Sequence, residues 1–123
     1  MNLQSLINQA IALKKEGKLS EGLAIYDQVY GELVKEATEH AISQHGTVAD
    51  EGSVRKILPK YFQVADEYMK KDKTVCTILN NMGVIFAELG EKVSAKKYFE
   101  ESIKYTPSGM DYENPRIGLT NLE

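Results

Sequence analysis

The chain has 123 residues, of which 42% are hydrophobic and 27% are charged, a mixture typical of one globular domain and too apolar for a disordered chain. Its 15 basic and 18 acidic residues are interleaved and leave a net charge of −3, so neither nucleic acid nor an acidic membrane surface is expected as a partner. No apolar run approaches the ~20 residues of a membrane span.

Hydrophobic residues recur at intervals of three and four, which predicts amphipathic helices and no strand. Gly17 and Gly90 are placed to end helices in the left-handed conformation, and Ser20 and Ser94 lie at or near the starts of the helices that follow. Two helical hairpins with tight turns are therefore expected. The predicted helices cover residues 2–16, 19–33 with a continuation to about 45, 54–72, 75–89 and 92–105, with a short turn after Pro115.

The middle of the chain holds the one predicted loop and two points where a helix can break. Residues 46–53 form the loop, because they combine two glycines with two acidic residues. Over 19–45 two helices can run together as one, and Gly31 is the natural place for a bend. The helix that contains Pro59 must either start near Lys56, which we favour, or kink at the proline.

Cys76 is the only cysteine, and it lies at the start of an apolar helix, where a small buried thiol is expected. The first lysines, Lys14 and Lys15, follow the first apolar segment, which is contrary to the order in a secretory signal. Without cysteine pairing or an export signal, the cytoplasm is the expected compartment.

The last third of the chain carries a spaced pattern of large and small residues. The pattern consists of Leu79, Met82, Gly83, Phe86, Ala95, Phe99 and Pro107. In spacing and in residue size it resembles the tetratricopeptide repeat, a helical hairpin of about 34 residues. Leu79 and Met82 stand in place of a bulkier Trp and a Leu.

A degenerate copy of this pattern occurs 73 residues earlier, which is the distance from Ala10 to Gly83. Small residues stay small in the copy, since Ala10 corresponds to Gly83 and Gly22 to Ala95. Such residues let the two helices of a hairpin approach, while large ones fill the gap between them. The copy comprises Leu6, Ala10, Leu13, Gly22 and Tyr26, with Gln9 and Val34 as departures.

The resemblance implies an all-α fold, a right-handed superhelical stack of about three antiparallel helix hairpins. The middle unit does not match the pattern and is placed by its length, and the alternative is that one long fused helix breaks the regular superhelix. Asn114-Pro115 is expected to start a C-terminal cap over the last hairpin. The single domain would then comprise a repeat over about 3–36, a degenerate unit over about 37–75, a repeat over about 76–109 and the cap over about 110–123.

Tetratricopeptide domains bind peptides in a concave groove lined by the first helix of each hairpin, so the resemblance implies a non-catalytic protein- or peptide-binding adaptor or scaffold. One subfamily clamps the C-terminal carboxylates of chaperones with basic and amide side chains. The matching positions here hold Ile7 and Ile11, then Thr77 and Asn81, which disfavours a chaperone tail as partner. Carried over by register, the groove residues are Gln4, Ile7, Asn8, Ile11 and Lys15 in the first repeat and Thr77, Asn80, Asn81, Val84 and Glu88 in the last.

Two alternatives stay open. The nearer one is self-association, for instance a homodimer that exchanges the long helix over 19–45. The distant one is a small metal-dependent enzyme using His40, His45 and Asp50, with Glu51 beside them. Histidines five residues apart on a helix point in different directions, unlike the i, i+4 pair of a zinc helix. Neither a metal, nor a cofactor, nor catalysis is therefore expected.

Overall fold

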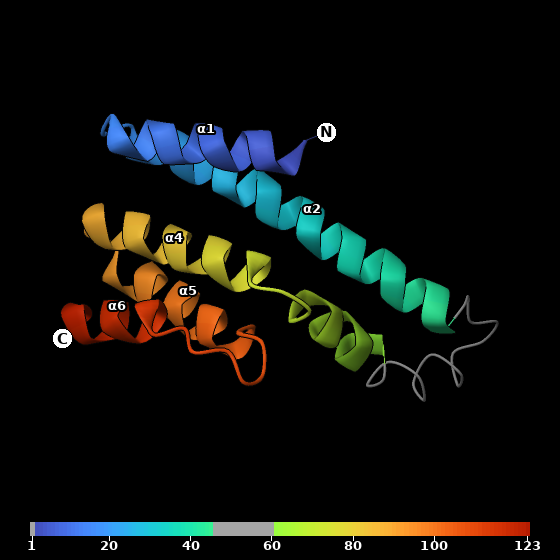
Figure 1. Ribbon diagram of the computed structural model, residues 1–123. Coiled ribbons are helices and arrows are strands. Elements are labelled where there is room, and N and C mark those ends of the chain that lie inside the picture. The colour runs from blue at the N-terminus through green and yellow to red at the C-terminus, as the bar shows by residue number, and fades with distance from the viewer. Residues whose placement is uncertain (1, 46–60) are drawn as a thin grey trace.

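The computed structural model describes residues 2–45 and 61–123, and all regular structure within them is helical (Figure 1). The all-α prediction is confirmed for this part of the chain. The helices are α1 (Leu3–Lys15), α2 (Leu19–His45), a segment over 61–69, α4 (Thr74–Glu88), α5 (Lys92–Lys104) and α6 (Asn114–Leu122).

Two glycines close the turns after α1 and α4, as predicted. Gly17 has a φ of 79° and Gly90 a φ of 81°, in the left-handed region that favours glycine. After α1, the amide of Lys18 donates to the carbonyl of Leu13 at 2.9 Å, and the same bond recurs after α4. This hydrogen bond defines a Schellman helix end, which turns the chain back at once and makes each pair a tight hairpin.

The hairpin of α1 and α2 lies against the hairpin of α4 and α5, because α2 packs on α4 (Figure 1). Packing within the hairpins is antiparallel. One buried cluster joins α1, α2 and α4 in the centre of the molecule. It consists of Ala10, Tyr26, Val29, Ile78, Met82 and Ile85.

A second buried cluster joins the later part of α2, the segment over 61–69 and the first half of α4. Tyr105, at the end of α5, completes it and donates its hydroxyl to Asp66 Oδ1 at 2.8 Å. Cys76 is fully buried there, as predicted. The cluster consists of Ala37, Met69, Val75, Cys76, Leu79 and Tyr105.

Helix α2 runs unbroken for 27 residues through Gly31, a length of about 40 Å. Its first part packs on α1 and its later part on the segment over 61–69, so one helix serves two neighbours. The segment ends at residue 69, earlier than the predicted 72. The predicted loop over 46–53 and Pro59 lie outside the described residues.

The C-terminal region forms a nine-residue helix, α6, where the sequence predicted a short turn. Pro115 lies in its first turn, as expected, and is buried. Asn114 was the expected N-cap, but Glu113 occupies that position and Asn114 is the first residue of the helix. Helix α6 packs on α5 and α4 and covers the last hairpin. Across residues 2–45 and 61–123, no helix is both long and apolar enough to cross a membrane.

Candidate binding groove between α1 and α4

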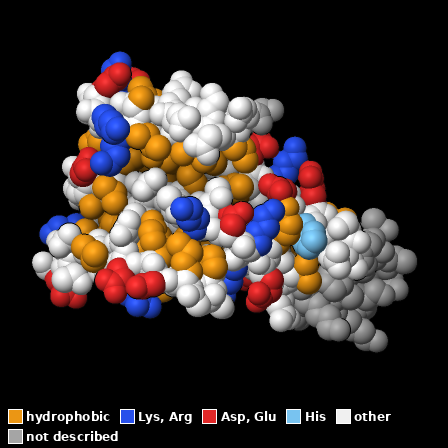
Figure 2. Space-filling view, in the orientation of Figure 1, with side chains coloured by type: hydrophobic (Ala, Val, Ile, Leu, Met, Phe, Trp, Pro, Cys, Tyr) orange, Lys and Arg blue, Asp and Glu red, His pale blue; other side chains and the backbone are white. Residues whose placement is uncertain are grey.

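Helices α1 and α4 run in the same direction (Figure 1), and α2 packs on both. At their carboxyl ends, Lys14 Nζ lies 3.3 Å from Glu88 Oε1. At their amino ends, Leu3 and Val75 line one pocket. Hydrophobic side chains form a band between the two helices in the space-filling view (Figure 2). We call the pocket, together with the strip that continues from it to the Lys14–Glu88 ion pair, the α1–α4 groove.

On α1, the predicted site residues occupy one face and remain accessible. Gln4, Asn8 and Lys15 are exposed, and Gln4 Nε2 donates to Asn8 Oδ1 at 3.0 Å. Ile11 is 37% exposed, and the half-buried Ile7 lines the pocket. The first repeat thus contributes a mixed strip of amides and partly exposed isoleucines.

On α4, Glu88 contacts α1, and the predicted residues Asn81 and Val84 lie on the same face of the helix as Glu88. Asn81 is half-buried and its Nδ2 donates to the hydroxyl of Tyr26 at 3.3 Å. Burial raises the pKa of Tyr26, and the hydrogen bond from Asn81 opposes that rise. Val84 is half-buried, and Glu88 is exposed in its ion pair with Lys14. The amide of Asn81 is therefore partly committed to the protein's own structure.

Thr77 and Asn80 are not brought to the groove, although the register placed them there. Both side chains lie close to Tyr112, in the segment before α6. Burial raises the pKa of that tyrosine, and its polar interactions with Thr77 and Asn80 oppose the rise. Asn80 is only 5% exposed, and its Oδ1 has no hydrogen-bond partner within the described residues. The C-terminal segment thus covers this side of α4.

The pocket at the amino end of the groove has a volume of about 250 Å³. Four segments build its wall, which contains both apolar and charged side chains. Its lining comprises Leu3, Gln4 and Ile7 of α1, Leu33 and Glu36 of α2, Tyr68, Met69, Lys71 and Asp72, and Thr74 and Val75 of α4.

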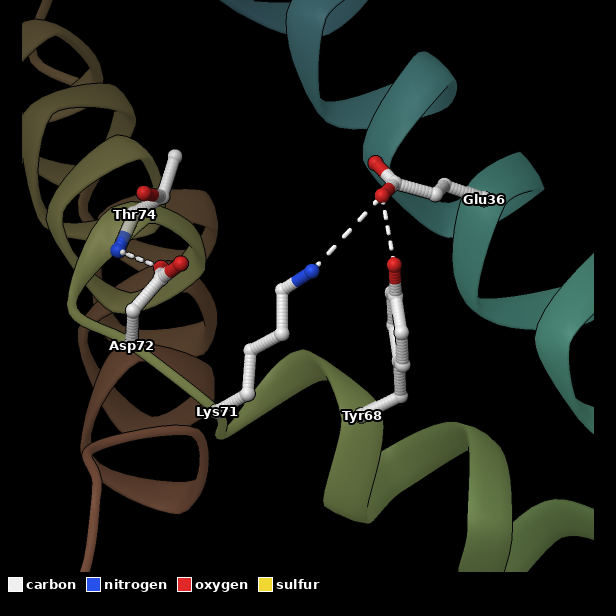
Figure 3. A network of polar contacts seen from close by, with 5 residues as sticks. All are labelled: Glu36, Tyr68, Lys71, Asp72 and Thr74. Atoms are coloured by element: carbon white, nitrogen blue, oxygen red, sulfur yellow. Dashed lines mark hydrogen bonds and ion pairs between the residues drawn. The ribbon is translucent and has the colours of Figure 1, made fainter.

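A polar network forms one wall of this pocket (Figure 3). The hydroxyl of Tyr68 donates to Glu36 Oε1, and Lys71 Nζ lies 3.6 Å from the same oxygen. Lys71 also lies 4.0 Å from the centre of the Tyr68 ring. Interaction with Tyr68 is the largest cause of a raised pKa for Lys71, and the Glu36 carboxylate adds to it, so this lysine keeps its charge. The wall therefore holds a cation beside a carboxylate and an aromatic ring.

At the edge of the network, Asp72 Oδ1 accepts the backbone N–H of Thr74 at 2.8 Å. This bond lowers the pKa of Asp72, so its carboxylate stays charged. Because a carboxylate at the start of α4 satisfies a free backbone amide and meets the positive end of the helix dipole, it stabilises the helix start.

Sequence reasoning missed the pocket residues Glu36, Lys71 and Asp72. They come from the middle of the chain, where the repeat pattern gives no register. Nothing local pairs Tyr68 with Glu36, which is 32 residues away. Only the spacing of Asp72 and Thr74 carried a local signal, that of a helix start.

The residues named for the metal-enzyme alternative are described only in part. Asp50 and Glu51 lie outside the described residues, and the ring of His40 stacks on Tyr68 with 4.4 Å between ring centres. Within residues 2–45 and 61–123, no group of three or more His, Cys, Asp or Glu side chains could hold a metal ion.

Comparison with protein families, curated proteins and solved structures finds no match for this chain. The case for a function therefore depends on the groove and on the sequence pattern.

Proposed function

We propose that this protein is a non-catalytic adaptor that binds a peptide or a protein segment in the α1–α4 groove. The observation that carries the proposal is the pairing of α1 with α4. These are the first helices of the two hairpins in which the repeat pattern occurs, and they run in the same direction, joined by the Lys14–Glu88 ion pair and a shared pocket. A shared groove between first helices is what the resemblance to tetratricopeptide repeats implies.

The chemistry of the groove suits a peptide chain. Ile7, Ile11 and Val84 leave apolar surface partly exposed. A bound peptide that removes this surface from water gains free energy of binding. The amides of Gln4 and Asn8 lie on the same face of α1 and can bond a peptide backbone. From residue 3 to residue 14, α1 rises about 16 Å, a length that about five extended peptide residues match.

We further propose that the helices form a right-handed tetratricopeptide-like stack in which α2 belongs to two hairpins. Its first part would be the second helix of the first hairpin, and its later part the first helix of the middle hairpin, with the segment over 61–69 as its partner. The packing of α2 on both neighbours supports this arrangement.

A displayed random library of peptides of about twelve residues tests the proposed function. Wild-type protein should enrich specific peptides, and Ile11→Glu should abolish their binding, because it places a charge on the apolar strip. The matched control is Ile117→Glu on α6, an isoleucine 53% exposed and away from the groove. Equal loss with both variants, or no enriched peptides on the wild type, would refute a groove-binding role.

A second candidate function is self-association, which a different observation favours. Ile42 of α2 is 45% exposed and Phe62 of the next helical segment is 58% exposed, and large apolar side chains exposed on a surface can mark a protein interface. Light scattering after gel filtration measures the mass across a range of concentrations. A monomer at every concentration would contradict this candidate and leave peptide binding untouched.

A further inference from the structure

We propose that the pocket at the amino end of the α1–α4 groove binds a basic side chain, lysine or arginine, of the bound peptide. This inference rests on the proposed function and specifies the chemistry of the partner. The features that support it are the size of the pocket, its charge and the contacts already made in its wall.

The pocket has the size for a side chain rather than for a cofactor. Its volume of about 250 Å³ lies below the range of about 300–1,000 Å³ typical of pockets for drug-sized ligands. Ile7 lines the pocket and lies on the same face of α1 as Gln4, Asn8 and Ile11. A peptide lying along α1 can therefore direct one long side chain into it.

The lining suits a long stem with a charged tip. Apolar side chains supply one part of the surface, and carboxylates supply another. Lysine and arginine bury their methylene stems against apolar surface while the charged group keeps a polar partner. The apolar lining consists of Leu3, Ile7, Leu33, Met69 and Val75.

The charge around the pocket is negative. An adjoining hollow on α2 shares Leu3 and Glu36 with the pocket and adds more acids than bases. Such an excess attracts a cation and repels an acidic side chain. Around the two hollows lie the carboxylates of Glu32, Glu36, Glu39 and Asp72 and the ammonium groups of Lys35 and Lys71.

The wall of the pocket already binds one cation from within the chain. Lys71 lies against Glu36 and over the ring of Tyr68, two kinds of group that bind ammonium. Both contacts to Glu36 end on one carboxylate oxygen, Oε1, and Figure 3 shows the other oxygen turned away from Tyr68 and Lys71. The second oxygen can accept a hydrogen bond from another cation.

An acidic or phosphorylated side chain would find its two best donors taken. The backbone amide of Thr74, at the start of α4, already donates to Asp72. Lys71 already pairs with Glu36. An anion would have to displace a carboxylate from each of these sites, which opposes binding of a negative group at this end of the groove.

The same peptide library tests the inference, because enriched peptides report their own composition. On wild-type protein, lysine or arginine should be enriched at one fixed position of the peptides that Ile11→Glu no longer binds. A synthetic peptide with that residue replaced by glutamine should bind about tenfold more weakly, the loss expected for one charge-assisted contact. Fluorescence polarisation measures this loss.

Protein variants then assign the preference to the pocket. Glu36→Gln removes the charge but keeps an oxygen for Tyr68, and it should bind the basic peptide about tenfold more weakly and the glutamine peptide unchanged. Glu39→Lys, at an exposed position, should weaken the basic peptide without touching Tyr68. Glu100→Gln is the matched control, an acid paired with a lysine on α5 at 3.9 Å, and should have no effect.

Failure of this inference can be told apart from failure of the proposed function. Peptides that bind in the groove without a basic preference, or with an acidic one, overturn this inference and leave the proposed function in place. A basic preference that persists in both Glu36→Gln and Glu39→Lys places the cation elsewhere and also overturns it. The absence of any enriched peptide overturns both proposals.

Discussion

Phe99 of α5 occupies the space that a side chain on Gly83 of α4 would need, since a Cβ at Gly83 would lie 2.7 Å from Phe99 Cε1. The same ring approaches α6, where a Cβ on Gly118 would lie 2.5 Å from Phe99 Cζ. Phe99 is 1% exposed. One buried ring thus sets the approach of three helices, which confirms the prediction that Gly83 allows a close approach and that Phe99 fills the gap.

Replacing Gly83 by alanine should therefore destabilise the protein, although alanine is the better helix former by about 1 kcal/mol. The added methyl group would overlap a ring that is confined on two sides, and overpacking of this kind costs about 1–3 kcal/mol. Urea unfolding followed by far-ultraviolet circular dichroism measures the change in the free energy of unfolding.

Gly31→Ala is the matched control for that experiment. Gly31 lies inside α2, and a Cβ there would meet nothing within 4 Å. Alanine should raise the free energy of unfolding by about 0.5–1 kcal/mol, because it restricts the unfolded chain without a clash. Changes of the same sign at Gly31 and Gly83 would contradict the packing argument.

Phe99→Ala should lower the free energy of unfolding by about 3–5 kcal/mol, the usual cost of emptying a buried aromatic site. Val93→Ala on the same helix is the control, because Val93 is 87% exposed and a surface change of this kind stays within about 0.5 kcal/mol. A loss below about 1 kcal/mol for Phe99→Ala would show that the ring contributes little to the core.

The parts of the fold that depend on local chemistry could be predicted from the sequence. Gly17 and Gly90 end helices through their own backbone conformation, so the positions of both tight turns followed from residue type and spacing. The unbroken course of α2 did not follow, because residue type alone does not decide whether a helix bends at Gly31 or continues through it. The length of α6 depends on packing against α4 and α5, which no local pattern reports.

The candidate site also contains residues that local spacing predicts and residues that only tertiary contacts bring together. The accessible face of α1, with Gln4 and Ile11, follows from helical spacing alone. Thr77 has the same spacing on α4 but lies close to Tyr112 of the C-terminal segment, and no local pattern predicts where that segment lies relative to α4. The Glu36–Tyr68 contact joins two helices across an unmatched middle unit, so only tertiary structure brings it into view.

Truncation after Thr106 should destabilise the domain, because it removes α6 and the segment that leads to it. Phe99 would lose its contact with Gly118, and Asn80 would lose Tyr112. Thermal unfolding should therefore shift to lower temperature. Removal of the exposed Glu123 alone is the control and should leave the melting temperature in place. A soluble truncated chain that melts like the full chain would show that α6 is not a stabilising cap.

Stability should fall in strong alkali through the half-buried Tyr30 and the buried Tyr105. In an unfolded chain tyrosine loses its proton near pH 10, whereas burial, the largest cause, raises the pKa of Tyr30 to about 12. Burial and the hydrogen bond to Asp66 also raise the pKa of Tyr105. Between about pH 10 and pH 12 the folded protein keeps protons that the unfolded chain releases, so the free energy of unfolding decreases as pH rises.

Tyr30→Phe tests this pH dependence, because phenylalanine keeps the ring and removes the ionisable group. The free energy of unfolding of the variant should decrease less steeply than that of the wild type between about pH 10 and pH 12. Both proteins carry the same lysines, so lysine titration cancels in the difference between the two curves. Urea unfolding at a series of pH values gives both curves, and curves that stay parallel throughout would mean that Tyr30 ionises as easily in the folded protein as in the unfolded chain.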